Sequence, residues 1–183
     1  MGAMPWKHVT RWHADPNDAL RELQAKFVSE HYPDIPSLIQ RHLESARQAA
    51  ELAQVEGDKY GLAACYREEI AMLEEASRQP LPNDPQARVA LIRKMHSNTG
   101  EGIGNVLDIE SVSDSGDVLN CRRLNDEQMV KIFGTRTPNE GTLDDQKMSS
   151  IFVELGRGES VCFPIFDPRE EPKVWVFAGY TVD

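Results

Sequence analysis

The hydrophobic period of the chain changes near residue 100, and this change constrains the fold most strongly. Residues 1–99 hold three of the 12 glycines and space their apolar residues as in helices, whereas residues 100–183 alternate apolar and polar residues. The first pattern is typical of amphipathic helices and the second of half-buried strands. The sequence therefore predicts an α+β protein, with a helical region over 5–99 and a mainly β region over 100–183, as one domain or two tightly coupled lobes.

The first region predicts three or four helices. Asp15 and Pro16 indicate an N-cap followed by proline at the first helical position. Small and apolar residues recur at helical spacing on both sides of Gly57, which predicts a tight antiparallel hairpin. A run with three prolines follows this hairpin, and beyond it Val89–Ile92 fits either a helix or a short buried strand. The expected helices cover residues 16–31, 34–57, 58–79 and 84–97.

The turn of this hairpin carries a local resemblance. Residues 57–60 (Gly-Asp-Lys-Tyr), followed by Ala64, Tyr66 and Ile70, are similar to the turn between tetratricopeptide units. The resemblance covers about 20 residues, and the 34-residue period of that family does not recur. We interpret the segment as one helical hairpin rather than a solenoid.

The second region predicts a five-stranded, mainly antiparallel sheet with one inserted helix. A turn at Ser113–Gly116 indicates a hairpin between the first two of these strands. Asn125 caps a short helix, which Gly134 ends. Both faces of the last strand are apolar, so we expect it to be central, with helices on at least one face. The expected strands cover residues 106–112, 118–124, 151–155, 159–166 and 174–182, and the helix covers 126–133. Residues 1–4 read as a cloning remnant, and no element is assigned before residue 15.

The net charge of −10 is concentrated in the second region. Residues 1–99 hold 12 Lys and Arg against 14 Asp and Glu (−2), and residues 100–183 hold 8 against 16 (−8). This balance argues against a nucleic-acid surface, which needs clustered cations. An acidic surface can steer a basic partner, although the same charge also serves plain solubility. No apolar run approaches the ~20 residues of a membrane span, so we expect no contact with a membrane. Three cysteines that are odd in number and far apart make no disulfide framework, which predicts a reduced, cytoplasmic protein.

No motif in the chain identifies a reaction. The glycines of residues 100–104 lack the order and spacing of a phosphate-binding loop. His8 and His13 are five residues apart, which fits no familiar zinc pattern, so we expect neither a metal nor another cofactor. The three cysteines, Cys65, Cys121 and Cys162, lie among apolar residues and are expected to be inert, buried thiols in a reducing compartment. The catalytic residues, if any exist, stay unknown at this stage.

Two classes of function follow. The first is a non-enzymatic binding protein of the inhibitor, immunity or adaptor type, whose acidic β region docks on a basic protein. Its expected binding residues are carboxylates on turns and strand faces: Glu110, Asp114, Asp117, Glu170 and Glu171. The second is a small enzyme or ligand-binding protein that uses carboxylates with a cysteine or histidine in a cleft between the two regions. The charge distribution favours the first class.

Overall fold

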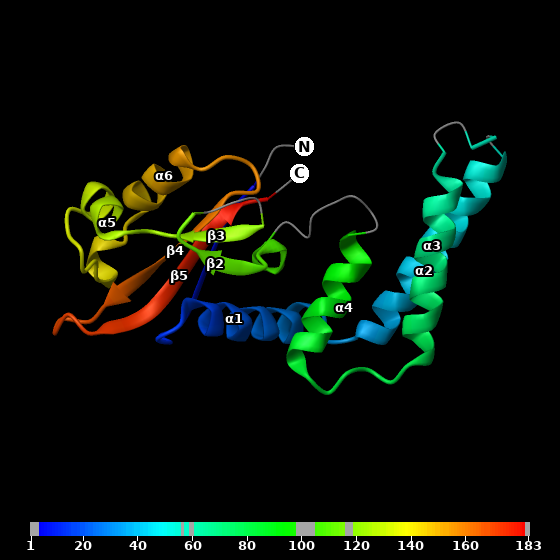
Figure 1. Cartoon of the computed structure of the whole chain (residues 1–183), viewed down its shortest axis with the longest axis horizontal. Coiled ribbons are helices and arrows are strands. Elements are labelled where there is room, and N and C mark those ends of the chain that lie inside the picture. The colour runs from blue at the N-terminus through cyan, green and yellow to red at the C-terminus, as the bar shows by residue number, and fades with distance from the viewer. Residues whose placement is uncertain (1–3, 56, 59–60, 98–104, 116–118, 182–183) are drawn as a thin grey trace. The chain divides into compact units, whose positions relative to one another are not determined.

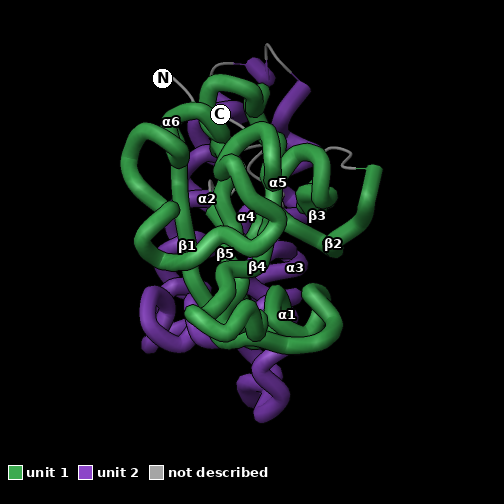
Figure 2. The backbone as a smooth tube through the Cα atoms, turned by 90° about the vertical axis from the view of Figure 1, so that its left-hand side faces the viewer, with its two compact units in different colours: residues 1–24, 101–183 green, residues 25–100 purple. Residues whose placement is uncertain are grey.

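The computed structural model describes residues 4–55, 57–58, 61–97, 105–115 and 119–181. The chain divides into two compact units (Figure 2): unit 1 comprises residues 1–24 and 101–183, and unit 2 comprises residues 25–100. The described residues contain six α-helices and five strands, so the predicted α+β class is confirmed. None of the described helices combines the length and the hydropathy that a membrane crossing needs.

Unit 1 is built on a five-stranded sheet with both parallel and antiparallel pairs. The prediction of a mainly antiparallel sheet is therefore wrong in part. The strands of this sheet run in the order β1-β5-β4-β3-β2. The pairs β1/β5 and β4/β5 are antiparallel, whereas β2/β3 and β3/β4 are parallel. The strands are β1 (Pro5–Arg11), β2 (Ser111–Ser113), β3 (Asn120–Arg123), β4 (Ser160–Phe166) and β5 (Pro172–Tyr180).

Two of the expected strands are wrong in place or pairing. Residues 151–155 fall almost entirely within a helix, α6 (Asp145–Glu154). The missing strand is supplied by β1, which lies within the region 5–99 that was expected to be helical. Residues 106–112 begin as a short 3₁₀ helix (Val106–Asp108) and extend only afterwards as β2. Because β2 and β3 are parallel, no hairpin joins them, although the turn signal at residue 113 suggested one.

Two α-helices lie between β3 and β4, where one was predicted, but several other predictions for this unit are confirmed. The strand β5 is central, between β1 and β4, and α5 (Asp126–Phe133) has the predicted bounds. Asn125 caps α5 through a hydrogen bond that the Gln128 amide donates to its side chain. Gly134 ends the helix with a φ of 77°, in the left-handed region that favours glycine.

Helices cover both faces of this sheet (Figure 1). The helices α5 and α6 pack on one face, where Phe133 meets Phe163 with ring centres 5.0 Å apart. The first half of α1 (Pro16–His31) lies on the other face. Successive side chains of a strand point to opposite faces, so Trp175 and Phe177 on β5 face α1. The apolar residues of both faces are fully buried and form the core of unit 1.

Trp175 is the largest fully buried side chain of the described residues. Its ring stacks on Trp12, with ring centres 4.9 Å apart and an angle of 12° between the planes. Its indole N–H donates a hydrogen bond of 2.9 Å to the carbonyl oxygen of His13. Trp175 therefore attaches the segment between β1 and α1 to the centre of the sheet.

Unit 2 contains the helical hairpin that the sequence predicts. It is formed by α2 (Ile35–Val55) and α3 (Ala63–Arg78), which α4 (Pro85–Ser97) follows. Ile39 and Leu43 of α2 and Leu73 of α3 are buried within it. The described residues between 16 and 79 contain no strand, so the predicted helical character of this segment is confirmed.

Candidate functional site

The parallel pairing of three strands brings acidic segments of the chain to one end of the sheet. Because β2, β3 and β4 are parallel, their carboxyl ends lie at the same end of the sheet. Asp114 follows β2, Asn125 to Glu127 follow β3, and the turn over residues 167–171 follows β4. We call this the strand-end surface, defined by Asp114, Asp126, Glu127, Glu170 and Glu171.

An open hollow of about 660 Å³ lies on the strand-end surface. Asp114, Asp126 and Glu127 line it, together with Arg123. The Arg123 guanidinium lies over the Trp175 ring, 5.6 Å from its centre, a cation–π geometry that stabilises its position. Three acidic residues and one arginine therefore line the hollow.

The turn between β4 and β5 presents Glu170 and Glu171 to solvent. The carboxylate of Asp167 organises this turn, because it accepts hydrogen bonds from the backbone N–H groups of Arg169 (2.8 Å) and Glu171 (2.9 Å). Glu170 adopts a positive φ of 61°, and a bond of 3.0 Å from its N–H to the Asp167 carbonyl closes the turn. The fold thus holds both carboxylates at the tip of a defined turn.

Three of the five predicted binding residues follow strands at the same end of the sheet. Asp114, Glu170 and Glu171 lie at the strand-end surface, whereas Glu110 precedes β2 and lies at the opposite end of that strand. Asp117 lies outside the described residues. Sequence reasoning missed Asp126 and Glu127, which it placed only in a helix. Their position directly after a predicted strand could have indicated that they lie at a sheet end. To place them beside Asp114, however, one must know that β3 is parallel to β2.

Most carboxylates of the strand-end surface have no salt bridge within the described part of the chain. Asp126 lies 4.0 Å from the Arg136 guanidinium, whereas Asp114, Glu127, Glu170 and Glu171 have no cation at salt-bridge distance. Nearby, Lys173 is engaged by Glu140 at 2.9 Å, an interaction that raises the pKa of Lys173. The surface therefore offers four unpaired negative charges to a partner.

A second polar cluster joins β1 to α1. Both Arg11 Nε and His13 Nε2 donate hydrogen bonds of 2.7 Å to the same oxygen of Glu22, Oε2. An imidazole beside a carboxylate can take part in acid–base chemistry. Here the carboxylate oxygen is shared with a guanidinium, an arrangement that fixes the approach of β1 to α1. The sequence analysis considered His13 only as a metal ligand and missed Glu22.

Glu22→Gln should lower the stability of the protein near neutral pH, and the loss should fade in acid. Burial acts most strongly on the Glu22 pKa and raises it, but the hydrogen bonds from Arg11 and His13 together outweigh this effect and lower the pKa from 4.5. A lowered carboxylate pKa contributes stability that is present above the unfolded-state pKa and is lost as the pH falls through the folded-state pKa.

We therefore expect the stability difference between the wild type and Glu22→Gln to be complete above about pH 5.5 and to shrink below about pH 4.5. Its size should not exceed about 1 kcal/mol, because the Glu22 side chain is 35% exposed and solvent screens the interaction. Urea unfolding across this pH range measures it, with Glu51→Gln on α2 as the control. A difference that does not change with pH would contradict this role of Glu22.

The cysteines of the sheet do not supply a nucleophile. Cys121 and Cys162, on the neighbouring strands β3 and β4, are buried as predicted. A hydrogen bond with Cys121, together with burial, raises the pKa of the Cys162 thiol well above its ordinary value, so it stays protonated. The prediction for Cys65 is wrong: this residue lies on the exposed side of α3, because the inward positions of that helix are taken by residues such as Leu73.

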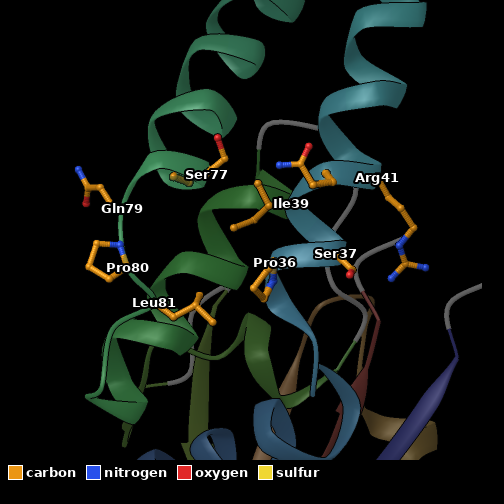
Figure 3. Close-up of a pocket in the computed structure, with 10 residues that line it drawn as sticks. Pro36, Ser37, Ile39, Arg41, Ser77, Gln79, Pro80 and Leu81 are labelled. Atoms are coloured by element: carbon orange, nitrogen blue, oxygen red, sulfur yellow. The ribbon is translucent and has the colours of Figure 1, made fainter.

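Unit 2 contains an open, mainly apolar groove of about 720 Å³ between the start of α2 and the end of α3. Pro36, Ile39, Pro80 and Leu81 line it, and Figure 3 shows Arg41 extending away from Pro80 and Leu81. Arg41 is the charged residue among those that line the groove. The groove contains no arrangement that identifies a ligand, and we assign it no function.

The comparisons with known proteins leave the function to be argued from the geometry. Searches with the chain found no matching protein-family model, curated protein or solved structure. Across the described ranges, no group of three or more His, Cys, Asp or Glu residues is arranged to hold a metal ion.

Proposed function

We propose that this chain is a non-enzymatic binding protein whose strand-end surface docks on a basic protein partner, as inhibitor, immunity and adaptor proteins do. The observation that carries the proposal is that Asp114, Glu127, Glu170 and Glu171 follow strands at the same end of the sheet and have no salt-bridge partners in the described chain. Unpaired charges on a rigid scaffold raise the rate of encounter with a complementary surface.

The geometry of the hollow supports the same class of partner. Its acidic residues come from two separate segments, at Asp114 and at Asp126–Glu127, and line an open space of about 660 Å³. Such a space can accept a lysine or arginine side chain, whose charge would meet carboxylates on more than one side.

The alternative class, an enzyme that uses a cysteine or histidine, has less support. The Cys162 thiol has a raised pKa, and His13 is bound to a carboxylate oxygen that Arg11 also occupies. Both arrangements favour a structural role over attack on a substrate.

Affinity isolation tests the proposal with the full chain immobilised and a lysate of the source cell. The test variant carries Asp114→Lys, Glu170→Lys and Glu171→Lys, and the control carries Glu44→Lys, Glu51→Lys and Glu68→Lys on α2 and α3. Both have a net charge of −4, since three reversals add +6 to −10.

We expect a protein of high isoelectric point to be retained by the wild type and by the control, released by about 0.5 M salt, and lost from the test variant. Equal retention by the two variants would contradict the proposal, because it would show that net charge and not the strand-end surface governs binding. The absence of any retained basic protein would contradict it as well.

A further inference from the structure

The two edge strands of the sheet in unit 1 differ in how far their outward backbone groups are hydrogen-bonded. At one edge, the side-chain amide of Asn17 covers β2: its Oδ1 accepts a hydrogen bond of 2.8 Å from the Val112 N–H, and its Nδ2 donates one of 3.4 Å to the Val112 carbonyl. Asn17 thus takes the place that a further strand would occupy. These bonds occupy the backbone groups of the middle residue of β2 and so oppose pairing with another chain at this edge.

The other edge is formed by β1, and its hydrogen bonds to β5 use every second residue. The N–H of Thr181 donates to the carbonyl of Met4 (3.0 Å), and the N–H of Trp12 donates to the carbonyl of Lys173 (3.2 Å). In an antiparallel pair, the residues that bond to the neighbouring strand alternate with residues that face away from it. The even-numbered residues of β1 therefore bond to β5, and the odd-numbered residues face outward.

Three outward-facing residues, Lys7, Val9 and Arg11, leave their backbone groups open. Within the described part of the chain, no hydrogen bond engages the N–H or the C=O of these residues. The same three side chains are exposed, and Val9 keeps 49% of its surface in solvent. This edge, which we call the β1 edge, is a seven-residue strand with an exposed apolar residue, Val9, between two exposed basic residues. Such an edge is a template for a further strand.

The charges of the β1 edge distinguish between possible occupants. A second copy that paired symmetrically about Val9 would place Lys7 opposite the Arg11 of the other copy, and like charges directly opposite one another destabilise a strand pair. Arg11 is bonded to Glu22, whereas Lys7 has no salt bridge among the described residues. A strand with an acidic residue opposite Lys7 and an apolar residue opposite Val9 complements this edge.

We propose that the β1 edge binds an extended segment of an acidic partner protein as a sixth, antiparallel strand. The backbone groups of Lys7, Val9 and Arg11 supply the hydrogen bonds, and Lys7 selects the acidic residue. This surface is separate from the strand-end surface and has the opposite charge, so its partner differs from the basic protein proposed above. Backbone pairing gives such a complex its affinity, and the side chains give it specificity.

The test uses the full chain and two synthetic peptides with blocked ends, Thr-Glu-Thr-Val-Thr-Glu-Thr and Thr-Lys-Thr-Val-Thr-Lys-Thr. Paired about Val9, the first places a glutamate opposite Lys7 and the second a lysine. Titration of ¹⁵N-labelled protein, followed by NMR at the amide signals of residues 7, 9 and 11, gives the affinities. We expect the glutamate peptide to bind about 10-fold more tightly than the lysine peptide.

Two variants separate the proposal from nonspecific attraction. Val9→Pro removes an N–H that the sheet does not use, so the fold should persist while the peptide loses a central hydrogen bond and at least about 10-fold in affinity. Val9→Thr keeps this N–H and is the matched control, with affinity close to that of the wild type. Lys7→Glu should reverse the preference between the two peptides.

Four outcomes would overturn the proposal. They are equal binding of the two peptides to the wild type, unchanged binding by Val9→Pro, an unchanged preference in Lys7→Glu, and no binding of either peptide. If Val9→Pro unfolds, the peptide preferences of the wild type and of Lys7→Glu still test the proposal. Sedimentation of the wild type supplies a further check: a dimer that Val9→Pro abolishes would show that the β1 edge pairs with a second copy, contrary to the proposal.

Discussion

Trp175→Ala should lower the free energy of unfolding by about 3–5 kcal/mol, the range for large aromatic residues removed from a well-packed core. Trp175 is fully buried, stacks on Trp12 and donates a hydrogen bond to the His13 carbonyl. Its removal leaves a cavity beneath α1 and a carbonyl without its donor. A loss of this size is a large part of the total stability of an ordinary domain.

Urea unfolding followed by far-UV circular dichroism measures this loss. Fluorescence of the remaining tryptophans adds a local probe, because Trp6, Trp12 and Trp175 all belong to unit 1. Trp12→Ala is the control: Trp12 is only half-buried, so its removal should cost less, about 1–2 kcal/mol. A loss below about 1 kcal/mol for Trp175→Ala would show that this residue does not hold the segment after β1 against the sheet.

The helices were predictable because their signals are local. Asp15 and Pro16 mark the start of α1, and Asn125 and Gly134 bound α5, in agreement with the structure. Caps and prolines act through backbone groups a few residues away, so a single sequence contains the whole argument. The spacing of apolar residues likewise predicted the helical hairpin of α2 and α3.

The helix α6 shows how a short apolar run misleads. Residues 151–155 are apolar enough for a strand, but Met148, Ile151, Phe152 and Leu155 also follow helical spacing, and all four contribute to the core beneath α6. Asp144 caps this helix by accepting a hydrogen bond of 2.7 Å from the Lys147 N–H. The cap was the signal that decides between the two interpretations.

The strand β1 and the direction of β2 could not be predicted from local signals. In β1, half-buried residues such as Trp6 and His8 alternate with exposed ones, so its apolar signal is weak without its partner β5. The direction of β2 depends on β3 and β4, which lie elsewhere in the sequence. The strand-end surface exists only because these strands are parallel. The sequence could therefore indicate acidic turns, but not which of them meet.

Reversal of the strand-end charges should slow association with the basic partner about 10-fold or more at low ionic strength, where steering between charged surfaces is strongest. The variant with Asp114→Lys, Glu170→Lys and Glu171→Lys removes three of the carboxylates and adds cations in their place. These residues are exposed on turns and at a strand end, so the fold should be retained. Asp126 is left unchanged, because its charge favours the first turn of α5.

The most direct test of the proposed function is the association rate constant, measured by stopped flow with the captured partner at about 10 mM and 150 mM salt. The control with Glu44→Lys, Glu51→Lys and Glu68→Lys has the same net charge of −4, so it reports the effect of total charge alone. We predict that the strand-end variant associates about 10-fold more slowly than this control at low salt and that the difference narrows at high salt. Equal rate constants for the two variants at low salt would contradict a docking role for the strand-end surface.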